Sequence, residues 1–248
     1  MSEAKEDDAK EGLLGHLTEL RTRLLRIICA LLAVFVAVFP FAGELYSLLA
    51  APLLAKLSPG GDLIAIGVLT PFMVQLTTAF FAAVVIALPY MFYEIWRFVA
   101  PGLYSGEKRL IAPLVISSTL LFFAGMVFAY FLVFEVVFGF IAAVTPEDVL
   151  WTPDISEFLA FAAALFLAFG AAFEMPVAVW LLVRSGAVTV EQLKKARPYI
   201  IVGAFVVAAI VTPPDVISQL LLAIPCWLLF ELGLFLAPKK PKPPKENQ

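Results

Sequence analysis

The chain has 248 residues, of which 62% are hydrophobic and 15% charged. A soluble domain is about half apolar and a quarter charged, so this composition excludes a water-soluble fold for most of the chain and indicates lipid surroundings. The net charge of -3 is uninformative by itself, because basic and acidic residues gather in different segments.

Six apolar runs predict an all-α polytopic membrane protein with six transmembrane helices. The first run is longer than the apolar core of a signal peptide and ends in no clear A-x-A site, so we expect it to remain as an anchor. We predict one membrane domain over residues 1–236 and a basic disordered cytoplasmic tail over 237–248. The predicted spans are 24–42, 71–95, 110–144, 158–183, 199–211 and 216–236.

The basic residues determine the predicted orientation. All of the 17 Lys and Arg residues except Lys56 lie in the N-terminal segment, the second and fourth loops and the C-terminal tail. Positive charge marks cytoplasmic segments, so both termini are predicted to be cytoplasmic. The third loop, 145–157, is acidic and is predicted to lie outside the cytoplasm.

The first loop, 44–70, is long enough to be structured. Leu45, Leu48, Leu49 and Leu53 recur at helical spacing and predict an amphipathic helix on the outer interface. Pro52 is expected to bend or restart this helix.

The fifth and sixth helices are predicted to be short. The run 199–211 covers about 20 Å of a hydrocarbon core about 30 Å thick, and Pro225 interrupts the sixth span. Because Pro198 and the T-P-P-D turn at 212–215 limit helical extension, we favour a locally thinned bilayer here. The alternative is that both helices extend into flanking residues.

The composition also argues against several chemistries. Cys29 and Cys226 lie in apolar runs without C-x-x-C spacing, and His16 is the only histidine. No G-x-x-x-x-G-K-[ST] string suggests nucleotide hydrolysis. We therefore expect a protein that is not an enzyme and that holds no metal or cofactor.

Six motifs together resemble the TatC family of twin-arginine protein export, and the resemblance covers residues 13–236. They occur in the order and spacing of that family. The motifs are H-L-T-E-L-R-T-R-L (16–24), W-R-F-V-A-P-G-L-Y-S-G-E-K-R-L (96–110), F-E-M-P (173–176), K-K-A-R-P-Y (194–199), G-A-F-V-V (203–207) and T-P-P-D-V-I-S-Q (212–219).

The resemblance implies a receptor and scaffold in the bacterial cytoplasmic (inner) membrane, with a concave face. It implies that the protein binds twin-arginine signal peptides at its cytoplasmic face and assembles with further copies and with TatA-like and TatB-like single-span subunits. Folded proteins would then cross the membrane at the expense of the proton-motive force. No nucleic acid is implied.

The resemblance assigns the signal-peptide arginines to Glu19 and Glu107. Guanidinium groups match carboxylates bidentately and stay charged, so a lysine pair should bind less well. Charge pattern alone favours another interpretation, in which both are ordinary exposed or first-turn acids. Phe98 is implied as part of the docking patch, and Arg21 as a motif position, although an interfacial aromatic and a positive-inside anchor are the alternatives.

Glu174 is predicted to lie about 14 Å inside the fourth span, where an ionised carboxylate costs at least about 2.5 kcal/mol. It should face a polar concavity, an inserted peptide or a partner helix; a neutral buried acid is the alternative. Glu135 departs from the family pattern and is expected toward the outer interface. Glu94 and Glu231 are expected to be interfacial near cytoplasmic ends.

Three polar residues surround the predicted short hairpin on the outer side: Thr212, Asp215 and Gln219. The resemblance implies contact with partner helices, and Asp215 can also cap the sixth span.

Two other classes of function fit the sequence less well. A proton-coupled small-solute transporter would use Glu135 and Glu174, but repeated halves are missing. An intramembrane protease would need more than Asp215.

Overall fold

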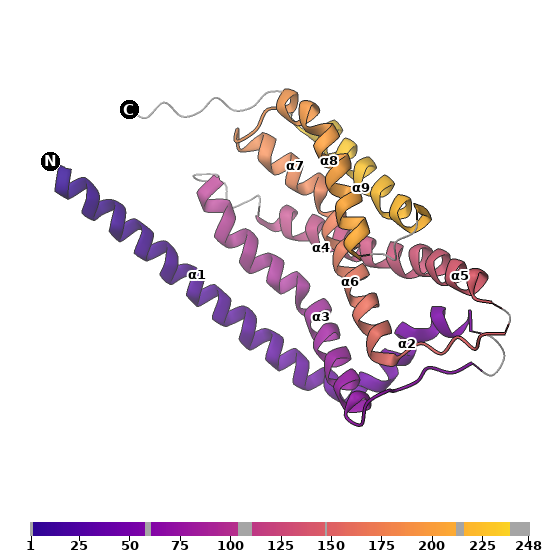
Figure 1. Ribbon diagram of the computed structural model, residues 1–248. Helices are drawn as coiled ribbons and strands as arrows, with labels where there is room; N and C mark the ends of the chain where they lie inside the picture. The colour runs from indigo at the N-terminus through magenta and orange to yellow at the C-terminus, as the bar shows by residue number, and fades with distance from the viewer. Residues whose placement is uncertain (1, 58–60, 104–110, 147, 212–215, 239–248) are drawn as a thin grey trace.

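The structure is a computed structural model that describes the chain except residues 1, 58–60, 104–110, 147, 212–215 and 239–248. The described residues are almost entirely helical, as the sequence predicts (Figure 1). The elements are α1 (Ser2–Val38), η1 (Phe39–Phe41), α2 (Ala42–Leu54), α3 (Thr70–Leu103), α4 (Ile111–Phe128), the π-helical η3 (Ala129–Val133), α5 (Phe134–Val144), α6 (Ile155–Phe173), α7 (Met175–Arg184), α8 (Val190–Val211) and α9 (Val216–Leu236).

Five stretches of the described residues are long and apolar enough to cross a membrane, so this is a multi-pass membrane protein. They correspond to the predicted first, second, third, fourth and sixth spans. They are Leu17–Leu54, Thr70–Val99, Ile111–Val144, Ile155–Arg184 and Gln219–Leu236.

The predicted fifth span lies in α8, which differs from the prediction. Pro198 does not end this helix, which begins at Val190 and continues through the proline to Val211. Its 22 residues cover about 33 Å. Its first turns carry Glu191, Lys194, Lys195 and Arg197, so its apolar part stays as short as predicted although the helix does not. Water at an interface can satisfy the carbonyl that loses its donor to Pro198.

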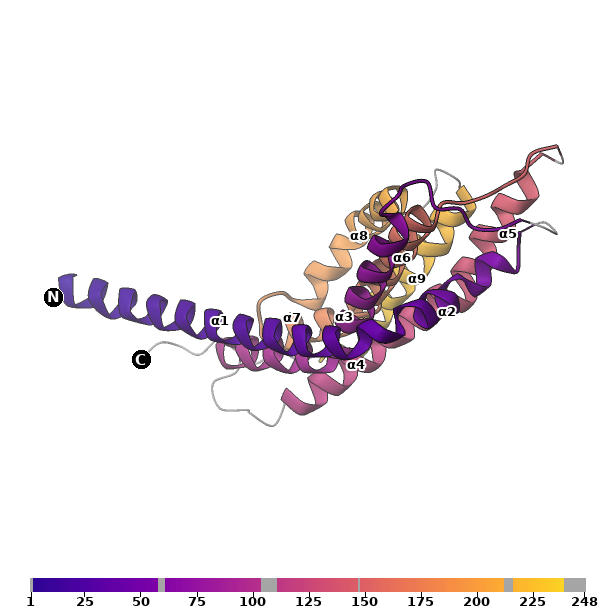
Figure 2. The ribbon, with the colours of Figure 1, turned by 90° about the horizontal axis from the view of Figure 1, so that it is seen from below.

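Successive long helices run in alternating directions (Figures 1 and 2). The start of α1, the end of α3 and the start of α8 lie toward one end, which we call the basic end. We call the other end, which holds α2 and the loop before α6, the acidic end.

Two loop segments meet at the acidic end. Ile64 and Asp154 form an isolated parallel bridge, and the Asp154 carboxylate caps α6 by accepting from the backbone N–H groups of Ser156 and Glu157. It also accepts from the N–H of Ile66 over 3.0 Å. These hydrogen bonds, above all that from the Ser156 hydroxyl, lower the pKa of Asp154 to about 2.

The predicted helix of the first loop is present as α2. Pro52 lies inside it, near its C-terminal end, and the described residues between Leu54 and Thr70 form no second helix. Leu53 and Ala50 are buried against the core, while Leu48 stays exposed. Beyond α2, Lys56 forms an ion pair with Glu135, so Glu135 does reach the acidic end.

The largest core cluster joins η3, α5 and α6 through aromatic rings. Phe134 and Phe169 are fully buried, and the Phe134 ring lies 5.3 Å from that of Phe166. Glycines allow α4 and α6 to approach closely: a Cβ on Gly125 would lie 2.4 Å from the carbonyl oxygen of Phe169. The core thus fixes α4 and α6, which frame the sites described next.

Candidate functional site

The basic end carries a buried ion pair between α1 and α3. Nη1 of Arg23 donates to Oε2 of Glu94 over 2.9 Å. Arg23 is 8% exposed and Glu94 only 2%. A buried charge is tolerated only with a partner and further hydrogen bonds, and the Tyr90 hydroxyl supplies one to Oε1 of Glu94 over 3.1 Å. Nη1 of Arg26 approaches Oε1 to 3.8 Å.

Glu94 was expected to be interfacial near a cytoplasmic end, and that expectation did not include a buried ion pair. Glu94 is near the end of α3, but the packing of α1 along α3 covers it. Arg23 and Arg26 lie on one face of α1 because their spacing is close to one helical turn. A single sequence does not reveal that this face meets α3.

Glu19 shares Arg23 with Glu94. Nε of Arg23 donates to Oε1 of Glu19 over 3.0 Å, and Nη2 donates to the same oxygen. The side chain of Glu19 is 47% exposed, against 2% for that of Glu94. One guanidinium thus links an accessible carboxylate to a buried one.

A hollow of about 660 Å³ lies beside this cluster, between α1, α3 and α4. Its polar rim is made by Arg23, Tyr93 and Arg97. Nη1 of Arg97 donates to the Tyr93 hydroxyl over 3.2 Å. Its apolar wall comes from the start of α4 and consists of Ile111, Ala112, Val115 and Ile116.

The other residues predicted to bind the signal peptide are not part of the Arg23–Glu19–Glu94 cluster as it is described. Arg21 is exposed on α1, two residues after Glu19, and Phe98 is half-buried near the end of α3. Glu107 lies outside the described residues. The structure therefore links Glu19 to Glu94 and to the hollow through Arg23, and the predicted pairing of Glu19 with Glu107 stays a prediction.

Glu174 lies at a break in the fourth span, between α6 and α7. Pro176 has no N–H to continue the α6 ladder, which explains why the helix restarts at Met175. Glu174 is half-buried, and its Oε1 is buried without a hydrogen-bond partner among the described residues. In α4, the Ser118 hydroxyl accepts from Nε1 of Trp96 over 3.0 Å.

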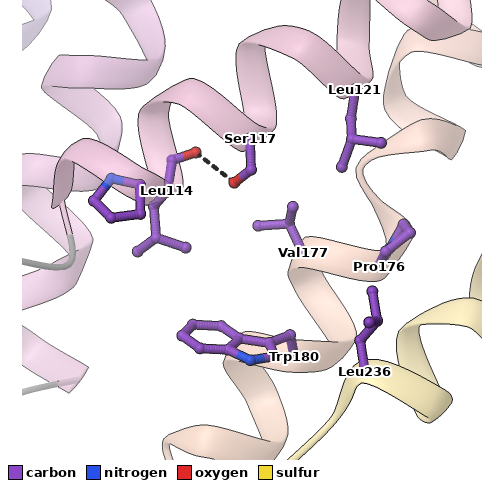
Figure 3. Close-up of a pocket in the computed structure, with 8 residues that line it drawn as sticks. Leu114, Ser117, Leu121, Pro176, Val177, Trp180 and Leu236 are labelled. Atoms are coloured by element: carbon purple, nitrogen blue, oxygen red, sulfur yellow. Dashed lines mark hydrogen bonds between the residues drawn. The ribbon is translucent and has the colours of Figure 1, made fainter.

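A second, smaller hollow of about 280 Å³ opens between α4, α7 and the end of α9 (Figure 3). Val177 and Trp180 point into it from α7, Leu236 closes it from α9, and the Ser117 hydroxyl donates to the carbonyl of Leu114 over 3.1 Å. No charged residue lines it among the described residues. It can therefore take an apolar group but offers no counter-ion to an arginine.

Of the three predicted partner-contact residues, the structure describes Gln219. Thr212 and Asp215 lie outside the described residues, and Gln219 is half-buried in α9. Glu231, also in α9, accepts from Nη2 of Arg197 in α8 over 2.7 Å. This ion pair holds α8 against α9 at the basic end. It gives Glu231, which was expected to be interfacial, a partner.

Comparisons with known proteins agree with the motifs. The family model of the Sec-independent protein translocase protein (TatC) matches residues 15–225. A Sec-independent protein translocase protein TatC from Azotobacter chroococcum is 50% identical over 95% of this chain and 92% of its own. The Escherichia coli K12 protein of the same name is 48% identical over 91% and 87%.

Solved structures agree as well. A crystal structure of the twin arginine translocase receptor TatC superposes with a TM-score of 0.78 and 40% identity, over 89% of this chain and 97% of that one. These matches give no support to a small-solute transporter. They are to a protein translocase family without enzymatic activity.

Proposed function

Because the chain belongs to the TatC family of Sec-independent protein translocase proteins, we propose that it is the receptor that binds twin-arginine signal peptides at the basic end of the bundle. Glu19 receives one arginine of the pair, and Glu107 receives the other. The apolar stretch of the peptide enters the hollow lined by the start of α4.

The observation that carries this proposal is the position of Glu19. Its carboxylate is 47% exposed and is bonded to Arg23, which lines a hollow with a polar rim and an apolar wall. A signal peptide has the matching order, with guanidinium groups first and an apolar run after them. A charge-assisted guanidinium–carboxylate pair is among the stronger hydrogen-bonded contacts in proteins.

We further propose that six spans place both termini in the cytoplasm of a bacterium, with the short apolar part of α8 as the fifth crossing of the inner membrane. All of the 17 basic residues except Lys56 fall on one set of alternating segments, which supports this orientation. The short apolar part of α8 favours a thinned bilayer beside it.

Partner helices of TatA-like and TatB-like subunits are proposed to pack near Thr212, Asp215 and Gln219. A polar side chain in a partner helix needs a polar mate in lipid, and these residues supply candidates. Glu174 is proposed to contact the inserted peptide or a partner helix, since its Oε1 is buried without a protein partner among the described residues. The proton-motive force is the proposed energy source.

Photocrosslinking tests the receptor role. A photoreactive residue is placed at Thr18 or Leu20, beside Glu19, and the assembled translocase in vesicles is offered a signal peptide with R-R or with K-K. The R-R peptide should label the receptor more strongly, because Arg binds carboxylates bidentately. Equal labelling by both peptides would remove the receptor proposal. A probe at Glu44, on the acidic end, is the control and should label with neither.

A further inference from the structure

Arg23 bonds to both Glu19 and Glu94, and this sharing suggests how the receptor exchanges arginines. We propose that Arg23 is an internal stand-in for a signal-peptide arginine, and that Glu94 is a positioning residue that retains Arg23 when the peptide takes Glu19. The proposal rests on the function proposed above. Glu94 then determines how readily Arg23 releases Glu19 to the peptide.

Competition at Glu19 follows from the hydrogen-bond geometry. Arg23 directs both Nε and Nη2 at Oε1 of Glu19. An incoming guanidinium that binds bidentately needs both carboxylate oxygens, including Oε1. Arg23 must therefore give up part or all of its contact with Glu19 before the peptide arginine can form its full pair.

Glu94 makes this exchange possible without leaving a buried cation unpaired. Its Oε2 accepts from Nη1 of Arg23, which is the one terminal nitrogen not directed at Glu19. Tyr90 holds the other oxygen of Glu94, so the carboxylate keeps its position when Arg23 shifts toward it. Since a buried charge without a partner is costly, the Glu94 carboxylate lowers the cost of releasing Glu19.

The exposed fractions of the two acids determine which of them the peptide arginine can reach. Glu94 is 2% exposed and cannot itself meet a peptide, whereas Glu19 is 47% exposed. When Glu94 loses its negative charge, Glu19 is the charged partner that remains to Arg23 of the two carboxylates described here. Arg23 then holds Glu19 more tightly, and the twin-arginine peptide binds less well.

The test is a cycle of variants assayed for peptide affinity in the purified full-length receptor. Glu94→Gln keeps the shape and an acceptor oxygen, and it should weaken binding of the R-R peptide by about tenfold, the equivalent of one charge-assisted hydrogen bond. The double variant Arg23→Gln/Glu94→Gln lacks both the arginine that competes for Glu19 and the carboxylate that holds it. It should bind the R-R peptide at least as tightly as the wild type. Glu44→Gln, an exposed acid at the acidic end, should change nothing.

Replacing Arg23 also removes the unpaired buried charge, so affinity is compared well below the unfolding temperature of each variant, where all of them are folded. Competition at Glu19 predicts that Glu94→Gln binds the R-R peptide weakly under these conditions, whereas a structural role predicts that it binds as the wild type does. Wild-type affinity in Glu94→Gln, or binding by the double variant that stays below wild type, would overturn the inference. If Glu94→Gln alone does not yield a monodisperse protein, the double variant decides by the same criterion. Failure of the proposed function looks different: Glu19→Gln would then bind the R-R peptide as the wild type does.

Discussion

The guanidinium of Arg23 in α1 lies 2.9 Å from the carboxylate of Glu94 in α3, and both side chains are buried. This pair is the polar centre of the α1–α3 contact at the basic end. The exposed carboxylate of Glu19 is held to it through the same guanidinium. The stability of the helix pair and the position of the proposed binding residue therefore depend on one side chain.

Glu94→Ala should destabilise the protein by about 3 to 5 kcal/mol, because it leaves Arg23 buried without its closest buried partner. Thermal unfolding of the purified protein in a mild detergent measures the change. Arg26→Gln is the matched control: Arg26 is 51% exposed and 3.8 Å from Glu94, so its loss should cost less than about 1 kcal/mol. Equal effects of both substitutions would contradict the importance of the buried pair.

Two glycines in neighbouring helices should respond in opposite ways to alanine. Gly125→Ala places a Cβ 2.4 Å from the Phe169 carbonyl oxygen and should destabilise the protein by about 1 to 3 kcal/mol by forcing α4 from α6. Gly139 in α5 has nothing within 4 Å of its added Cβ, so Gly139→Ala should stabilise by up to about 1 kcal/mol through helix propensity. The same unfolding measurement compares them, and a shared sign would contradict the packing described.

The Asp154 cap should make stability depend on pH in the acid range. Its folded pKa of about 2 lies below the unfolded value of 3.8, so its contribution is full above about pH 4 and is lost as the pH falls through 2. The melting temperature of Asp154→Asn should lie furthest below that of the wild type above pH 4 and converge with it toward pH 2. Asp148→Asn, which changes an exposed acid in the same loop, controls for charge alone; a gap at Asp154 that is constant with pH would refute the ionic cap.

Glu174 is expected to lower the stability of the folded protein and to be needed for export. Its Oε1 is buried without a hydrogen-bond partner among the described residues, and such a group costs about 1 to 3 kcal/mol. Glu174→Met, which has a similar volume, should raise the unfolding temperature while reducing export and crosslinking to the inserted peptide. Unchanged export would show that Glu174 has no contact role.

The sequence predicted the elements best where hydrophobic runs are long and uninterrupted. The third span, predicted over 110–144, appears as α4, η3 and α5 in one continuous path from Ile111 to Val144. Pro198 misled the prediction of the fifth span, because proline ends a helix only where the lost hydrogen bond cannot be replaced. The basic residues around it indicate a watery interface, where it can be replaced.

The site was harder to predict because its key contact joins residues far apart in the chain. Glu19 was identified from a motif, but its link to Glu94 spans two helices whose mutual register no local pattern records. The clue available in the sequence was energetic: an acid inside an apolar run, such as Glu94, needs a partner. Arg23 and Arg26 were counted as orientation signals, which concealed their role as those partners.

The ratio of affinities for R-R and K-K signal peptides, measured in wild type and in Glu19→Gln, tests the central claim most directly. Wild type should favour the R-R peptide by about tenfold, and the preference should fall several-fold in Glu19→Gln, in which Glu107 still receives the other arginine. Glu44→Gln should keep the wild-type ratio. A preference that survives unchanged in Glu19→Gln would show that this carboxylate does not read the arginine pair.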